Sequence, residues 1–536
     1  MFAILIALWW VAVVLSTAMV ATLAALLVGA VTVRIAQWVR LRRARHDAGA
    51  PERDHAPDAA VTRPGWTERA RARRGLLSVW LVTFVTWIAL ECLGGAFLLW
   101  NARASLAPLP NDLPPSPPGS FAIVAIGEST TLGAPYDPRL SFAHVVGWRV
   151  AAAFPDLHVS VENLAFGGAV LEEMHDALRR LETQPDLVLV YAGHNEFLRF
   201  PPDREAGRPY YGLKHFSLLA RAIAAQLERL GAHEGPTWKG QRRLIDRPIC
   251  TAHEMAQIHR RFQTTLADIL RHMQTAGRPA IVFLPASNES GFEPNRSTLP
   301  DDAPASTRAR LEAIYERLTL PGLQPRAELR LLQRARRLAP GFAETWFRLG
   351  RWYEAAGRTA KARRCYQRAI DTDGFPVRAT SEIRRRIRTA AREYGATLLD
   401  ARDLMVGFTA DGILGNDVFH DNCHPNLPIH VALANAVLRT LSARGIPRAW
   451  PSPGDLPADI AATVPATIAR FGLDQTAWIE ICEREVTFQE YLRVYSYQTE
   501  ARERRKEAYQ AAADRLRRGV PPPAAGIPAM ESPAFW

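Results

Sequence analysis

Metal-binding cysteine spacings are missing from this sequence. None of its five cysteines stands in a Cys-x-x-Cys pair, the spacing by which zinc sites are recognised. We therefore expect no metal and no cofactor. Cys92 falls in a predicted membrane span, and the others can form disulfides in an oxidising compartment or stay reduced: Cys250, Cys365, Cys423 and Cys482. A pair between Cys423 and Cys250 is one option.

Charged side chains are absent from residues 1–33. This apolar run exceeds the roughly 20 residues that cross a bilayer, so it predicts a transmembrane helix. A cleaved signal peptide would begin with positive charge and have a shorter apolar core, whereas here the arginines follow the run, from Arg34 onward.

A second span is predicted at residues 76–100, where Glu91 is the sole charged group and Trp80 and Trp100 stand near the ends. The loop between the spans, residues 34–75, holds eleven Arg against five Asp or Glu. The positive-inside rule places this loop in the cytoplasm and everything after Trp100 outside it. We therefore expect a multi-pass protein of the cytoplasmic membrane with its main domain on the periplasmic side.

The net charge of +12 does not indicate nucleic-acid binding, because half of it lies in this loop, where topology and anionic lipid explain it. Glu91 is either a functional ionisable group within the membrane or a side chain that reaches water at the outer end of its helix.

Strand-like and helix-like runs alternate after a proline-rich linker at residues 101–119. This rhythm over residues 120–445 predicts an α/β fold, a doubly wound parallel sheet of about five strands. The expected strands are 121–126, 158–164, 187–192, 280–284 and 396–400. The expected helices are 141–154, 170–183, 253–275, 378–394 and 428–443.

Two insertions interrupt the rhythm, at 197–250 and 288–375. The second contains Trp346, Leu349, Gly350 and Tyr353, spaced as in a tetratricopeptide helix-turn-helix repeat, with repeat-like helices over about 326–372. One repeat cannot bury its own core, so we expect a helical insert docked on the main domain, with a groove for a partner peptide as the alternative.

Residues 446–518 predict a C-terminal helical region, with helices at 457–471 and 474–518. The charge-dense run from Ala501 to Glu507 is typical of a solvated helix face. The proline-rich end, 519–536, is predicted to be disordered.

Ser129 follows an apolar strand that stops at Gly127, the usual place for an exposed nucleophile, although a serine there is also a common helix cap. A base and its holder stand together in Asp421-Asn-Cys-His424, where the carboxylate three residues before the imidazole can accept its Nδ1 proton. Gly168 and Asn195 follow two other strands and offer an N–H and an amide to an oxyanion.

These four blocks, in this order, resemble the SGNH hydrolase superfamily, also called GDSL esterases. The resemblance implies Ser129 as nucleophile, His424 as base held by Asp421, and an oxyanion hole of Ser129, Gly168 and Asn195. Glu128 stands where family members commonly have Asp. Glu128-Ser-Thr-Thr with a later Gly-x-Asn-Glu looks like the branch that carries tetratricopeptide repeats in bacterial envelope proteins.

Asn288 and Arg378 follow later elements and are expected at the rim of the same site, in contact with substrate. His194 is expected to be a pocket or core residue. His420 is a rival base, but no acid stands three residues before it.

The leading hypothesis is a membrane-anchored extracytoplasmic serine esterase that hydrolyses an acyl ester, with acetyl foremost, of a carbohydrate or lipid. The runner-up is an O-acyltransferase that modifies an envelope polysaccharide. The third is a non-catalytic scaffold that recruits an envelope protein through the repeat-like insert.

Overall fold

The structure, a computed structural model, describes residues 86, 89, 113–198, 252–300, 303–450, 460–493 and 500–520. The chain divides into two compact units, Met1–Val85 and Thr86–Trp536, and every described residue lies in the second. Both predicted membrane spans, the loop between them, Glu91 and Cys250 lie outside the described residues, apart from Thr86 and Ala89. Among the helices that are described, none has the length and apolar character needed to cross a bilayer.

Five parallel strands form one sheet in the order β2-β1-β3-β4-β5. The strands are β1 (Ser120–Gly127), β2 (His158–Asn163), β3 (Leu187–Tyr191), β4 (Ala280–Leu284) and β5 (Thr397–Asp400). The predicted parallel sheet is confirmed, with each strand within a few residues of its expected place. In such a sheet the site lies at the carboxyl ends of the strands, where the order reverses beside β1.

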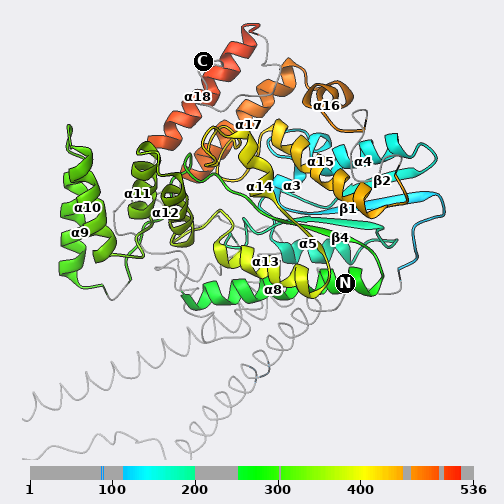
Figure 1. Cartoon of the computed structure of the whole chain (residues 1–536), viewed down its shortest axis with the longest axis horizontal. Coiled ribbons are helices and arrows are strands. Elements are labelled where there is room, and N and C mark those ends of the chain that lie inside the picture. The colour runs from blue at the N-terminus through cyan, green and yellow to red at the C-terminus, as the bar shows by residue number, and fades with distance from the viewer. Residues whose placement is uncertain are drawn as a thin grey trace, which may run out of the picture. The chain divides into compact units, whose positions relative to one another are not determined.

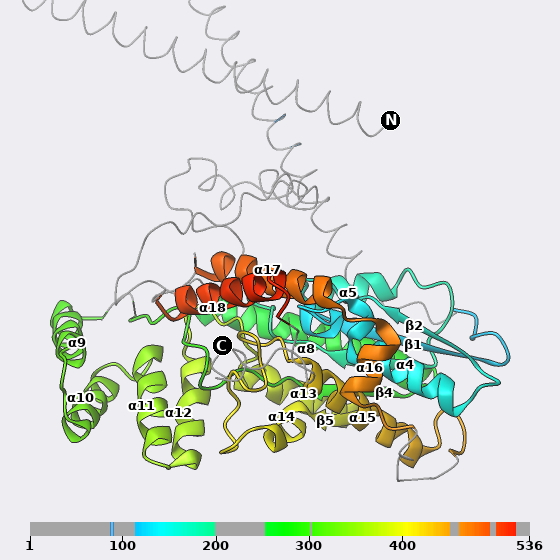
Figure 2. The ribbon, with the colours of Figure 1, turned by 90° about the horizontal axis from the view of Figure 1, so that it is seen from above.

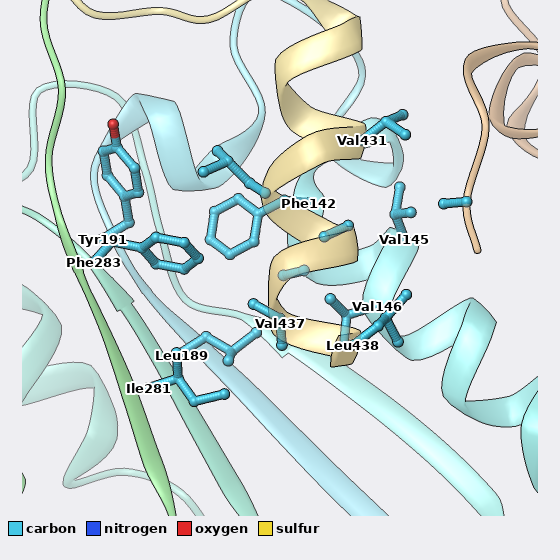
Figure 3. Close-up of a cluster of buried hydrophobic side chains, with 14 of the residues drawn as sticks. Phe142, Val145, Val146, Leu189, Tyr191, Ile281, Phe283, Val431, Val437 and Leu438 are labelled. Atoms are coloured by element: carbon cyan, nitrogen blue, oxygen red, sulfur yellow. The ribbon is translucent and has the colours of Figure 1, made fainter. Parts of the chain in front are cut away.

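Helices cover both faces of the sheet (Figure 1). One face packs against α4 (Phe142–Ala153), α14 (Ala401–Met405) and α15 (Leu427–Arg444), and the other against α5 (Leu171–Leu178), α8 (Ala252–Thr275) and α13 (Ser381–Glu393). Alternate side chains of each strand point to opposite cores, so Leu189 joins the first and Val188 the second. Figure 3 shows the first core, with Phe142 between the sheet and α15.

The second insertion forms four helices, of which the first two lie farthest from the sheet and the last two lie next to the main domain (Figures 1 and 2). They are α9 (Ala305–Leu318), α10 (Pro325–Leu338), α11 (Ala343–Ala355) and α12 (Thr359–Asp371). Gly350 lets α11 approach α12, because a Cβ there would lie 2.5 Å from the Tyr366 ring. Phe347 and Tyr366 pack against Ile413 of the main domain, so the insert is docked on that domain.

The C-terminal region forms α16 (Val464–Phe471), α17 (Gln475–Arg493) and α18 (Glu500–Arg517). The expectation of one helix over 474–518 is wrong. Lys506 forms an ion pair with Glu490 at 2.7 Å, although a continuous helix would hold residues sixteen positions apart roughly 24 Å apart. Trp478 of α17 and Tyr509 of α18 share a buried apolar cluster, and the two helices lie side by side in Figure 2.

The charge-dense start of α18 is only in part the solvated face expected from its sequence, with Arg504 exposed. Arg502 and Arg505 are buried, with guanidinium carbons 4.4 and 5.1 Å from the centre of the Phe292 ring. Both also pair with Glu293, at 3.2 and 3.5 Å. Stacking and pairing together make burial of the two arginines tolerable.

Candidate active site

Ser129 begins the short helix α3 (Ser129–Leu132) directly after β1. Gly127 is required at the end of the strand, since a Cβ there would lie 2.1 Å from the carbonyl oxygen of Tyr191 on β3. The turn lifts Ser129 to the carboxyl edge of the sheet, where its side chain is partly exposed. The position is that of a nucleophile on a strand-to-helix turn.

His424 lies between Ser129 and Asp421. Its Nε2 is 2.6 Å from Ser129 Oγ, and its Nδ1 is 2.5 Å from Asp421 Oδ2. The other carboxylate oxygen of Asp421 accepts the backbone N–H groups of Cys423 and His424, at 3.0 and 2.9 Å. The carboxylate is therefore fixed against the imidazole, and the imidazole faces the serine.

Asp421 is fully buried, yet it is suited to remain ionised. Burial works to raise the pKa of Asp421, but the neighbouring His424 and the two backbone hydrogen bonds bring that pKa below its usual range. An ionised Asp421 keeps the Nδ1 proton of His424 in place and leaves Nε2 as the acceptor for the serine proton.

Three hydrogen-bond donors surround the space in front of Ser129. Gly168 follows β2 with φ of +71°, a conformation that favours glycine, and Asn195 follows β3. Within the described part of the chain, no acceptor is bound by the backbone N–H groups of Ser129 and Gly168 or by the side-chain amide of Asn195. All three residues line the same pocket, so these donors are available to a substrate.

Glu128 holds the loop after β3 in position, and the sequence around Glu128 does not indicate this role. Its carboxylate accepts the backbone N–H groups of Gly193, His194 and Asn195 at 2.9, 3.0 and 3.0 Å. The side chain thus ties the loop that carries Asn195 to the turn that carries Ser129. Burial raises the pKa of Glu128 to about 7, although the three N–H groups act in the opposite direction.

The pocket at Ser129 has a volume of about 650 Å³. Most of its walls come from loops of the main domain, but Arg484, Glu485 and Phe488 of α17 close one side. The phenyl ring of Phe488 meets the imidazole of His424 edge to face, with centroids 5.2 Å apart. No motif distinguishes these three residues in the sequence, because their role depends on how α17 folds back over the site.

Glu485 is a buried carboxyl group on the wall of this pocket. It is 2 % exposed, and its Oε2 has no hydrogen-bond partner among the described residues. Burial raises the pKa of Glu485 well above its ordinary value, with the charge of Asp421 acting in the same direction. The raised pKa favours the protonated form of this carboxyl group, and in that form it can donate a hydrogen bond.

Asn288 and Arg378 lie beneath the pocket and not at its rim, which corrects the prediction that they contact substrate. Asn288 is fully buried, and its side-chain amide donates to the carbonyl oxygen of Asp421 at 2.8 Å and to Asn416 at 2.9 Å. Arg378 is 1 % exposed and donates to the carbonyl oxygens of Asn288 and Phe292. Both residues support the loop that holds Asp421.

The two neighbouring histidines do not act on Ser129. His194 is fully buried and accepts the backbone N–H of Ala379 at 3.1 Å, while burial lowers its pKa to about 3, so it is a neutral core residue. His420 lies between the hydroxyl groups of Tyr136 and Tyr509, at 2.7 and 2.8 Å, and burial lowers its pKa to about 4.

Cys423 lies beside the base, and its thiol is free, as are those of Cys365 and Cys482. The potential ligand atoms of Asp421, Cys423 and His424 lie within 4.8 Å of one another, which is close enough for a metal ion. However, burial raises the pKa of Cys423 well above its ordinary value, and Asp421 and His424 already bind each other. These residues therefore fit proton transfer better than metal binding.

This arrangement can cleave an ester. It supplies a hydroxyl nucleophile, a base within hydrogen-bond distance of it, a carboxylate that holds the base, and three donors around the position of the developing oxyanion.

Comparison with known proteins identifies the repeat. Residues 343–374 match the family model described as "Tetratricopeptide repeat", which covers α11 and α12 and confirms the repeat expected there. No curated protein matches the chain.

The comparison with solved structures finds matches to part of this chain. TesA is 14% identical with a TM-score of 0.24, covering 60% of this chain and 97% of that one. The acetylxylan esterase Axe2 from Geobacillus stearothermophilus is 13% identical with a TM-score of 0.27, covering 60% and 93%. A G-D-S-L family protein from Desulfitobacterium hafniense DCB-2 is 11% identical with a TM-score of 0.25, covering 60% and 99%. At such scores the likeness carries no argument, and the chemistry rests on the site itself.

Proposed function

We propose that this chain is a serine esterase that hydrolyses an acyl ester, with acetyl esters of a carbohydrate or lipid as its substrates. The observation that carries the proposal is the unbroken series of short hydrogen bonds from Ser129 through His424 to Asp421 at the edge of a pocket.

In the first half of the reaction, Ser129 Oγ attacks the ester carbonyl carbon while His424 Nε2 takes the hydroxyl proton. The carbonyl oxygen becomes an oxyanion, which accepts hydrogen bonds from the N–H groups of Ser129 and Gly168 and the amide of Asn195. The tetrahedral intermediate then collapses. The alcohol leaves with the proton from His424, and the acyl group stays on Ser129.

In the second half, His424 takes a proton from water, and the resulting nucleophile attacks the acyl-serine. The same three donors stabilise the second oxyanion. Collapse releases the carboxylic acid and returns the proton from His424 to Ser129. Asp421 holds the imidazole in one orientation throughout and stays ionised.

The pocket favours a substrate that combines an apolar group with a hydrogen-bond acceptor. Leu132, Val377 and Phe488 line its walls, and the Glu485 carboxyl group, whose pKa burial raises, offers a donor to an ether, hydroxyl or carbonyl oxygen when it is protonated.

We place this activity outside the cytoplasm, on a domain held at the membrane by the segments 1–33 and 76–100. This part of the proposal is supported by the two uncharged or nearly uncharged runs and by the excess of arginine between them. Protease access to residues 34–75 in spheroplasts and in inverted vesicles tests it: cleavage from the outer side would reverse the topology.

Acyl transfer to a sugar hydroxyl of an envelope polysaccharide is the second candidate. The edge-on contact of Phe488 with His424 favours it, because an apolar ring beside the base limits the access of water to the acyl-serine. The acceptor hydroxyl would then take the place of water in the second half of the reaction.

One experiment tests the esterase proposal and separates it from transfer. The purified full chain is given p-nitrophenyl acetate with and without an oligosaccharide acceptor, and acetate, nitrophenol and acetylated sugar are measured. Acetate equal to nitrophenol in both conditions supports hydrolysis, whereas faster turnover with acetylated sugar supports transfer. Absence of turnover, or equal turnover by Ser129→Ala, rejects both.

A scaffold role through the tetratricopeptide repeat remains the third candidate, with an envelope protein as partner. Its support is the repeat match over residues 343–374. Full function of the Ser129→Ala variant in cells would favour the scaffold over catalysis.

A further inference from the structure

A second cavity, of about 400 Å³, lies between the repeat insert and the main domain. Three separate elements contribute arginines to its lining: α12, α13 and α14. These residues are Arg363, Arg364, Arg384, Arg388 and Arg402. Glu289 is the sole acidic residue that lines it. The cavity, named here the arginine cleft, shares no lining residue with the pocket at Ser129.

The positive charge of the arginine cleft is only partly neutralised. Arg402 pairs with Glu289 at 2.8 Å, and Arg384 pairs with Asp400 at 3.0 Å. Arg388 is 3.8 Å from the same Asp400, which therefore serves two arginines. These five guanidinium groups thus have two carboxylate partners, Glu289 and Asp400.

Arg363 and Arg364 carry most of the positive charge that is not neutralised. Both are exposed side chains of α12, and neither forms an ion pair or hydrogen bond with another described residue. Across the cleft, α13 contributes the side chains of Arg384 and Arg388, whereas the backbone N–H of Ser381 at the start of this helix already donates to Asp371 at 2.8 Å. Positive charge therefore comes from both sides of the cleft.

The size and the charge of the cleft together define the kind of ligand. A volume of about 400 Å³ falls in the range of small-molecule sites, roughly 300–1,000 Å³, and exceeds what a single inorganic anion needs. Guanidinium groups bind carboxylate and phosphate oxygens through two parallel hydrogen bonds. Since arginines from different walls point to one space, a ligand with several anionic groups can meet more than one wall.

We infer that the arginine cleft binds a ligand carrying two or more carboxylate or phosphate groups. Such a ligand bridges Arg363 and Arg364 of the insert to the arginines of α13 on the main domain. It is either a free polyanionic small molecule or the acidic end of a glycan chain, which share this chemistry. The inference does not depend on the reaction at Ser129.

The test is isothermal titration calorimetry on the full chain in detergent. The probes are citrate and inorganic pyrophosphate as free polyanions, oligogalacturonate as an acidic glycan, and acetate as a single carboxylate. The variant is the double change Arg363→Gln with Arg364→Gln. The matched control is Arg368→Gln, an exposed arginine of the same helix that does not line the cleft. Thermal unfolding measured by circular dichroism checks that each variant is folded.

We expect a polyanionic probe to bind more tightly than acetate, and the double variant to weaken that binding at least about tenfold while Arg368→Gln leaves it unchanged. Tighter binding of oligogalacturonate than of citrate or pyrophosphate assigns a glycan, and the reverse assigns a free polyanion. The inference is overturned if no probe binds more tightly than acetate, or if the double variant and Arg368→Gln weaken binding equally.

Discussion

The ring of Phe488 meets the imidazole of His424 edge to face, with centroids 5.2 Å apart and planes at 72°. One residue lies on the C-terminal helix α17 and the other on the loop before α15, so a segment outside the α/β core contributes to the site of reaction. The contact orients the imidazole and covers one side of it.

Phe488→Ala should lower kcat/KM for an acetyl ester about two- to tenfold, since an edge-to-face aromatic contact contributes roughly 0.5–1.5 kcal/mol. Thr487→Ala is the control, because Thr487 is exposed on the same helix and does not line the pocket at Ser129. Equal rates for the two variants would remove α17 from the site.

Asn195→Ala should lower kcat about 10²- to 10³-fold with little change in KM, as expected when a donor to the oxyanion is lost. Asn195→Asp keeps the size of the side chain but replaces the donor by a negative charge, so its kcat should be lower still. Steady-state kinetics with an activated ester measures both. A KM effect alone would assign Asn195 to substrate binding.

Glu128 makes stability depend on pH. Because folding raises its pKa from 4.5 to about 7, its contribution is fully present below pH 4.5 and is lost as pH rises through about 7. The loss amounts to about 3 kcal/mol. Glu128→Gln cannot titrate, so its thermal midpoint should fall less between pH 4.5 and pH 7 than that of the wild type.

The exposed carboxyl group of Glu162 on β2 provides the control for Glu128. Glu162→Gln should retain the pH dependence of the wild type. If Glu128→Gln and the wild type lose the same number of degrees over this range, the raised pKa assigned to Glu128 is incorrect.

Arg502→Leu should destabilise the fold by roughly 3 kcal/mol, because it leaves the buried Glu293 with one of its two guanidinium partners. Arg504→Leu, an exposed neighbour on α18, should have a much smaller effect. Thermal unfolding measured by circular dichroism compares them. Midpoints that shift together would mean that the buried pair adds nothing to stability.

Much of the α/β core was predictable, because its strands are short buried runs bounded by glycine and polar residues. Val188 and Leu189 point to opposite cores, so the run that contains them is apolar throughout, which is the pattern of a parallel strand. The residues that meet at Ser129 were also predictable, since parallel strands bring their carboxyl ends to one edge.

Contacts made by the C-terminal helices were not predictable. Arg502 and Arg505 have the sequence character of a solvated face, and only the position of Phe292 and Glu293 explains their burial. Within the core, the position of the Asn288 side chain was likewise not predictable from the sequence. Its place after β4 suggested the rim of the site, whereas its amide turns inward to the carbonyl oxygen of Asp421.

The central claim is that His424, held by Asp421, activates Ser129. The most direct measurement is labelling of the full chain by a fluorophosphonate probe, with the modified residue located by mass spectrometry. We predict one label, on Ser129, a rate reduced about 10⁴-fold in Asp421→Asn, and no label in His424→Ala. Asp417→Asn, in the same loop, should label like the wild type. Persistent labelling of Ser129 in His424→Ala, or a label on another residue, would contradict the account.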